Sequence, residues 1–184
     1  MNYAVMNDDT MNVYIDKYNQ WLNEAWDLFT WISMCVRWTK PPVNNDYYSD
    51  FKEFDEYEVG IAVRSILPQG WWHNKKHSIQ DQKKQVKYLK DLINAEIKHK
   101  ARYYKNAEGH DVCGESHKDY YSNSIKKYNK HLRVLSYIEN EIDIVIAGIP
   151  CETVYNDEND ENEKESLMKF LNDFMEIINE QAEN

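Results

Sequence analysis

The sharpest cluster of side chains that could do chemistry is His110-x-x-Cys113-x-x-x-His117. Cysteine thiolates and histidine imidazoles are good ligands for Zn²⁺, and a short loop can fold three of them round one ion. A structural zinc site takes four ligands, however, and no second Cys or His pair completes this pattern. Zinc at His110, Cys113 and His117 is therefore a minor hypothesis beside the simpler expectation of a polar loop without a cofactor.

Other catalytic patterns are weaker. Cys113 beside a histidine could form a thiolate–imidazole pair, but no strand-to-helix elbow in the sequence offers an oxyanion hole. The chain has five Gly, and none of the glycine-rich phosphate-binding patterns occurs. We therefore expect a protein that is not an enzyme.

A second group that could bind a ligand is a set of lysines in a basic segment. Residues 71–135 carry 15 basic and 7 acidic side chains, whereas residues 1–70 carry 5 and 11, and residues 136–184 carry 2 and 14. The net charge of -10 thus conceals a basic middle between two acidic ends. One hypothesis is a nucleic acid or nucleotide bound through the basic side chains. The other is pairing with the protein's own acidic C-terminal region. The lysines in question are Lys83, Lys84, Lys87, Lys90, Lys126, Lys127 and Lys130.

Two features favour a protein partner. Trp71 and Trp72 follow a turn, and large aromatic side chains are common anchors at protein interfaces. The acidic run at 156–165 contains Glu158, Asp160 and Glu161, whose carboxylates can stand in for phosphates toward a basic protein surface. The plain alternatives are a tryptophan that covers the core and a solvated acidic tail.

The residue usage points to an AT-rich genome, because Asn, Ile, Lys and Tyr are frequent and Gly, Ala, Arg and Pro are scarce. Many phages, larger viruses and low-GC bacteria have such genomes. We expect an accessory or inhibitor protein of phage or mobile-element origin that binds a host protein, such as a defence factor. Three scattered Cys fit a reducing compartment, and no secretory signal or 18-residue apolar run is visible. A cytoplasmic protein without a membrane partner is expected.

The elements that position these residues are predicted to be helices. Apolar side chains recur at spacings of four and three from Met11 to Val36, in a helix that Thr10 can cap and that ends before Pro41-Pro42. This helix would form the spine of the core or one side of a homodimer. A second segment starts at Asp46 and continues into residues 59–67, which read as helix or as a short strand.

A long antiparallel helical hairpin is predicted over about 78–140, within the basic segment 71–135. The apolar run at 142–149 reads as a strand or a helix end. We expect a mainly α helical bundle in which residues 1–150 form one domain. An acidic linker would cover 151–165, and a C-terminal helix at 166–181 would pack on the domain.

Overall fold

The computed structural model describes residues 7–66, 79–110, 114–142 and 161–180, and every regular element in these ranges is helical. The predicted class, a mainly α helical bundle, is confirmed. None of the described helices is long and apolar enough to cross a membrane. In chain order the elements are α1 (Asp8–Trp38), the 3-10 helix η1 (Asp46–Phe51), α2 (Glu56–Ile66), α3 (Ile79–Tyr104), α4 (His117–Asn140) and α6 (Glu161–Asn179).

Helix α1 is the spine of the core. Ten of its side chains are buried, and they follow the predicted apolar stripe from Met11 to Val36. Its cap is Asn7 and not Thr10, because the Asn7 side chain accepts a hydrogen bond of 2.8 Å from the Thr10 backbone N–H. The helix ends at Trp38, just before the two prolines, which cannot donate to a further turn.

The segment after α1 is split into two short helices. Asn45 caps η1, and the Asp55 side chain accepts a hydrogen bond from the Glu58 backbone N–H at the start of α2. The alternative of a short strand near residues 59–67 is wrong, since α2 continues to Ile66. The apolar side chains in this stretch have helical spacing, with Val59, Ala62 and Val63 buried against the core.

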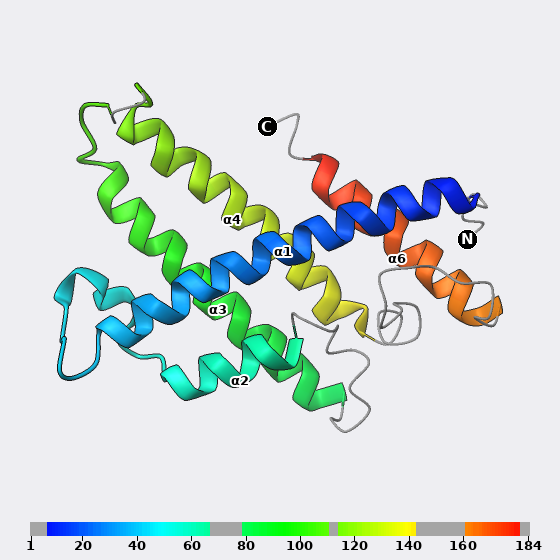
Figure 1. Cartoon of the computed structure of the whole chain (residues 1–184), viewed down its shortest axis with the longest axis horizontal. Coiled ribbons are helices and arrows are strands. Elements are labelled where there is room, and N and C mark those ends of the chain that lie inside the picture. Colours follow the sequence, from blue (N-terminus) through cyan, green and yellow to red (C-terminus); the bar gives the residue numbers. More distant parts are fainter. Residues whose placement is uncertain (1–6, 67–78, 111–113, 143–160, 181–184) are drawn as a thin grey trace.

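The predicted hairpin is formed by α3 and α4, which lie side by side and antiparallel (Figure 1). Ser116 caps α4 by accepting a hydrogen bond from the Asp119 backbone N–H. Near the other end, Lys90 Nζ lies 2.8 Å from Glu139 Oε2. Gly109, in the loop between the two helices, has a φ of +81°, a backbone conformation that suits glycine.

Helix α6 packs on α1 and α4. It buries Leu167, Phe170 and Phe174, and its Asp173 accepts a hydrogen bond of 2.8 Å from the Tyr137 hydroxyl of α4. The helix begins at Glu161, so the end of the segment expected as a linker is helical. The possible strand at 142–149 lies outside the described residues apart from Ile142, which is helical.

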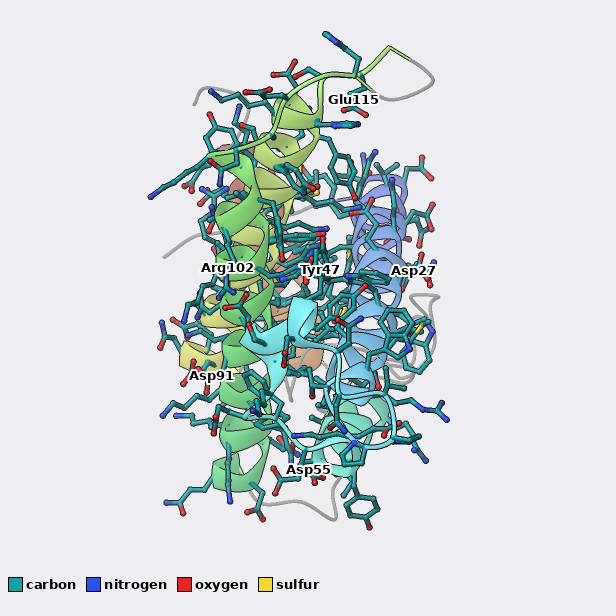
Figure 2. All side chains as sticks on the ribbon, turned by 90° about the vertical axis from the view of Figure 1, so that its left-hand side faces the viewer. Asp27, Tyr47, Asp55, Asp91, Arg102 and Glu115 are labelled. Carbon is teal, nitrogen blue, oxygen red and sulfur yellow. The ribbon has the colours of Figure 1, made fainter. Side chains whose placement is uncertain are left out.

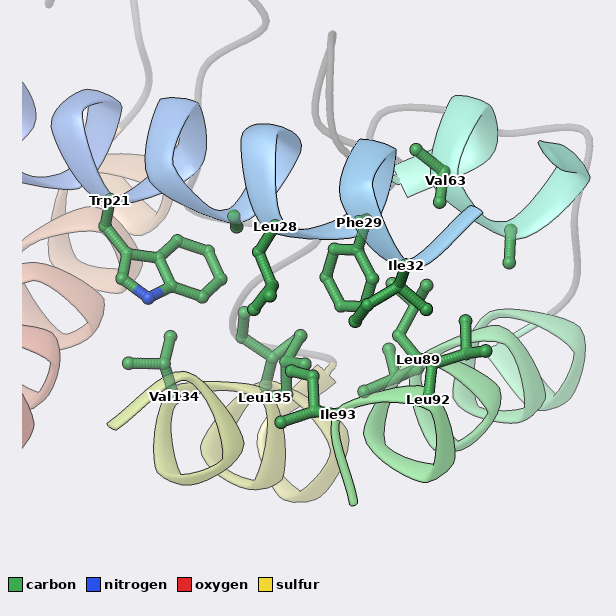
Figure 3. Packing of buried hydrophobic residues seen from close by; sticks show 14 of the residues in the cluster. Trp21, Leu28, Phe29, Ile32, Val63, Leu89, Leu92, Ile93, Val134 and Leu135 are labelled. Carbon is green, nitrogen blue, oxygen red and sulfur yellow. The ribbon is translucent and has the colours of Figure 1, made fainter. Parts of the chain in front are cut away.

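The core lies between α1 and the hairpin (Figure 3). Leu28, Phe29 and Ile32 of α1 point toward Ile93 of α3 and Leu135 of α4. Phe29, Ile32 and Ile93 have no exposed surface. Burial of large apolar side chains of this kind stabilises a fold by about 1.5–3 kcal/mol each. This core fixes α1 across the hairpin, and it thereby sets the distance between the polar edges of these helices.

Candidate binding cleft

A cleft of about 420 Å³ opens between α1 and the tip half of the hairpin. This volume falls in the range typical of ligand-binding pockets. Figure 2 looks along the layer of side chains between α1 and the hairpin, with Asp27 on α1 at one side of the layer. Two groups of residues line the cleft, which we call the α1 wall (Glu24, Asp27, Leu28 and Trp31) and the hairpin wall (Lys100, Tyr120, Ser124, Lys127 and Tyr128).

The two walls carry opposite charges at the mouth of the cleft. Glu24 and Asp27 are three residues apart on α1 and so lie on the same side of the helix. Lys127 faces them from α4 and is exposed. Within the described part of the chain, none of these three side chains forms an ion pair. Their charges therefore remain available to a ligand that enters the cleft.

At the inner end of the cleft lies a buried ion pair. Lys100 Nζ is 3.6 Å from Glu96 Oε1, and the Glu96 side chain has no exposed surface. No described group lies within 3.5 Å hydrogen-bond distance of either Glu96 oxygen, but the Trp31 and Tyr128 side chains are close enough to help lower its pKa. Burial raises the pKa of Glu96, and the nearby Lys100 ammonium lowers it again in part. Lys100 and Glu96 thus compensate each other beneath the open part of the cleft.

Aromatic rings surround the Lys100 ammonium. Its Nζ lies 6.0 Å from the centre of the Trp31 ring, 5.4 Å from that of Tyr120 and 5.8 Å from that of Tyr121. Cations are attracted to the faces of such rings at these distances. Tyr120 is 46% exposed, so it also presents ring surface to the solvent. Three rings thus form an aromatic cage around Lys100, and two of them, Trp31 and Tyr120, line the cleft.

A second polar cluster joins η1 to α3. The Asp50 side chain is fully buried and accepts a hydrogen bond of 2.7 Å from Arg102. His99 Nδ1 lies 3.4 Å from the other Asp50 oxygen. Burial lowers the pKa of His99, Lys100 lowers it further, and Asp50 raises it in part. Rings of Tyr47, Tyr48, Phe51 and Tyr103 surround the His99 ring. The cluster positions η1 beside α3.

The residues proposed for zinc are only partly described. His110 and His117 are both exposed at the hairpin tip, where His110 pairs with Ser116 in an isolated β-bridge. A ring nitrogen of His117 lies 3.1 Å from the Glu108 carbonyl oxygen. Cys113 lies outside the described residues. Within the described ranges, no group of three His, Cys, Asp or Glu side chains could hold a metal ion. Zinc binding stays a prediction.

The seven lysines expected to bind an anion are distributed along both helices of the hairpin. Lys83, Lys84 and Lys87 are exposed in the first turns of α3, and none of them forms an ion pair with a described residue. Lys90 forms an ion pair with Glu139. The other three, Lys126, Lys127 and Lys130, lie on α4.

The separation of these lysines follows from the antiparallel register. The Tyr103 and Tyr121 rings lie 6.4 Å apart, so Lys126, five residues after Tyr121, is level with about residue 98 of α3. By the same register Lys130 is level with about residue 94, so along the hairpin Lys87 lies roughly 16 Å from the level of Lys126 and about 10 Å from that of Lys130. Lys127 also lines the cleft. Anion binding by the seven lysines stays a prediction.

The residues expected to contact a partner lie mostly outside the described ranges. This holds for Trp71, Trp72, Glu158 and Asp160, and Glu161 is described only as the first residue of α6. The cleft itself was not predicted. Its signals in the sequence are Glu24, Asp27 and Trp31 on one edge of a helix, and Glu96 with Lys100 one turn apart on an otherwise apolar face.

Comparison of the chain with protein-family models, with curated protein sequences and with solved structures finds no match.

Proposed function

We propose that this chain is a non-enzymatic accessory protein that acts by binding another protein, and that the cleft between α1 and the hairpin is the site where the partner docks. The observation that carries the proposal is the cleft, with its unpaired charges and accessible aromatic rings. Aromatic side chains beside charged groups are typical of the energetically important parts of protein interfaces.

The surroundings of the cleft support a macromolecular partner. Met34, on α1 beside the helix edge that carries Asp27 and Trp31, is 43% exposed. Exposed aromatic and methionine side chains are enriched at protein interfaces relative to the rest of the surface. A partner that reached the cleft could cover Met34 as well. The finer role expected from the sequence, inhibition of a host factor, requires a stable partner of this kind and belongs to the same proposal.

Affinity capture tests this function. The tagged protein is expressed in its natural host, and stoichiometric partners are identified by mass spectrometry. We expect one host protein to be retained by the wild type and lost with the Glu24→Gln/Asp27→Asn variant. Asp16→Asn is the matched control, because Asp16 is exposed on the same helix but does not line the cleft. Equal recovery with all three proteins, or with none, would contradict the proposal.

A second candidate function is nucleic-acid binding through the hairpin. The observation that favours it is the exposed group Lys83, Lys84 and Lys87, which is unpaired among the described residues. Lysine-driven binding to phosphates is strongest at low salt. A titration with single- and double-stranded oligonucleotides at about 50 mM salt should then show binding that the triple Lys→Gln variant loses. No affinity under these conditions would eliminate this candidate.

A further inference from the structure

We infer that the cleft accepts a basic side chain of the protein partner, an arginine guanidinium above all. The inference rests on the proposed function and adds the chemistry of the group that enters the cleft. Its site is the mouth of the cleft, between Glu24 and Asp27 of α1 and the exposed ring of Tyr120 on α4.

The charge of the cleft favours a cation. Lys100 is compensated by Glu96 at 3.6 Å, so its charge is largely cancelled toward the outside. What remains at the mouth is two carboxylates, Glu24 and Asp27, against one ammonium, Lys127. None of the three is paired with a described residue. A phosphate bound at Lys127 would be repelled by the two carboxylates, whereas a cation would be attracted to them.

The aromatic lining favours the same class of ligand. Three rings lie within 6.0 Å of one ammonium, that of Lys100, and the faces of such rings attract positive charge. Lys100 is buried, whereas Tyr120, which also lines the cleft, is 46% exposed. A second cation can therefore bind only nearer the mouth, beside the carboxylates.

Arginine fits this arrangement better than lysine. Its guanidinium is planar, so it can stack on the Tyr120 ring while its edge donates two hydrogen bonds to a carboxylate. An ammonium is a compact and strongly hydrated charge that gives up more water on entering such a cleft. Glu24 and Asp27, one helical turn apart, can each accept from the edge of the same guanidinium.

The test uses two capped peptides, acetyl-Gly-Arg-Gly-amide and its citrulline twin, in which a neutral urea group replaces the guanidinium. Binding is followed by NMR at the indole N–H of Trp31, assigned with a Trp31→Phe variant. We expect the arginine peptide to bind about tenfold more tightly than the citrulline peptide, because only the charged group gains the carboxylate and ring contacts. Equal affinities, or no shift with either peptide, would overturn the inference.

Two charge variants test whether the cleft attracts positive charge, because they should change the affinity for the arginine peptide in opposite directions. Glu24→Gln/Asp27→Asn should weaken the arginine peptide by about fivefold or more, and Lys127→Gln should strengthen it by about two- to fivefold. The control Asp16→Asn should leave the affinity for the arginine peptide unchanged. AMP serves as the anionic probe. If AMP binds in the cleft and Lys127→Gln weakens it while the arginine peptide does not bind, the cleft is an anion site and the inference is wrong.

The outcomes separate this inference from the proposed function. Arginine binding without a captured host protein would leave the cleft chemistry standing and contradict the function. A captured partner that depends on Glu24 and Asp27, together with peptides that do not distinguish arginine from citrulline, would leave the function standing and contradict the inference.

Discussion

The buried pair of Lys100 and Glu96 makes a sharp prediction about stability. Replacement of Lys100 by Met keeps most of the apolar stem but removes the ammonium. Glu96 then loses the only ion-pair partner that it has among the described residues, at 3.6 Å. Breaking a buried ion pair in this way costs about 3–5 kcal/mol. We expect a value near the lower end, about 3 kcal/mol, because the Lys100 side chain is 11% exposed toward the cleft.

The loss of stability in Lys100→Met should grow as the pH rises. Burial already raises the pKa of Glu96 in the folded protein, and Lys100 is the largest influence that lowers it. Without Lys100 the folded pKa rises further. The stability contributed by a raised carboxyl pKa is fully present below the pKa of the unfolded chain and is lost as the pH rises through the folded value. Lys100→Met should therefore be more destabilised at pH 8 than at pH 5.

Urea unfolding followed by circular dichroism at 222 nm measures both effects. The controls are Glu96→Gln and the double variant Glu96→Gln/Lys100→Met, which buries no unpaired charge and should recover much of the loss. In thermal melts, the midpoint of Lys100→Met should fall by roughly 6–12 °C for a chain of this size. A loss below about 1 kcal/mol with no dependence on pH would refute the reasoning, since Glu96 could not then be buried as a charged partner of Lys100.

Three further predictions concern other parts of the fold. Burial lowers the pKa of His131 to about 3, so the free energy of unfolding should fall as the pH drops below about 6.5, the ordinary histidine value. Between pH 6.5 and pH 4.5, urea titrations should show the free energy of unfolding falling by about 2–3 kcal/mol less in His131→Leu than in the wild type. Equal decreases in the two proteins would contradict the burial of His131. Phe29→Ala should cost about 3–5 kcal/mol in the same assay, because Phe29 has no exposed surface. Asp50→Ala should free η1 from Arg102 and speed limited proteolysis between α1 and α2, and the exposed control Glu53→Ala should not.

The fold could be predicted from the sequence because its helices repeat one pattern. The stripe from Met11 to Val36 and the rows of α3 and α4 are apolar at every third or fourth position, which determines both the helices and the faces that they bury. The boundaries were less certain. Residues 59–66 are apolar and β-branched enough to suit a strand, and only packing on α1 and α3 selects the helix.

The cleft could not be predicted for a different reason. Glu24 and Asp27 look like ordinary solvated acids in α1, and Lys127 looks like one of many hairpin lysines. Their relation depends on how far apart the core holds α1 and the hairpin, and helical periodicity contains no information about that distance. The buried Lys100 could have been suspected, since Glu96 and Lys100 interrupt an apolar face one turn apart.

The central claim is that a protein partner docks in the cleft through a cationic group. The most direct measurement is the dissociation constant of the captured host protein for three forms of this chain: wild type, Asp27→Asn and Lys127→Gln. We predict changes of opposite sign, with weaker binding for Asp27→Asn and tighter binding for Lys127→Gln, each by about two- to fivefold. Shifts in the same direction, or no shift in either variant, would contradict the account.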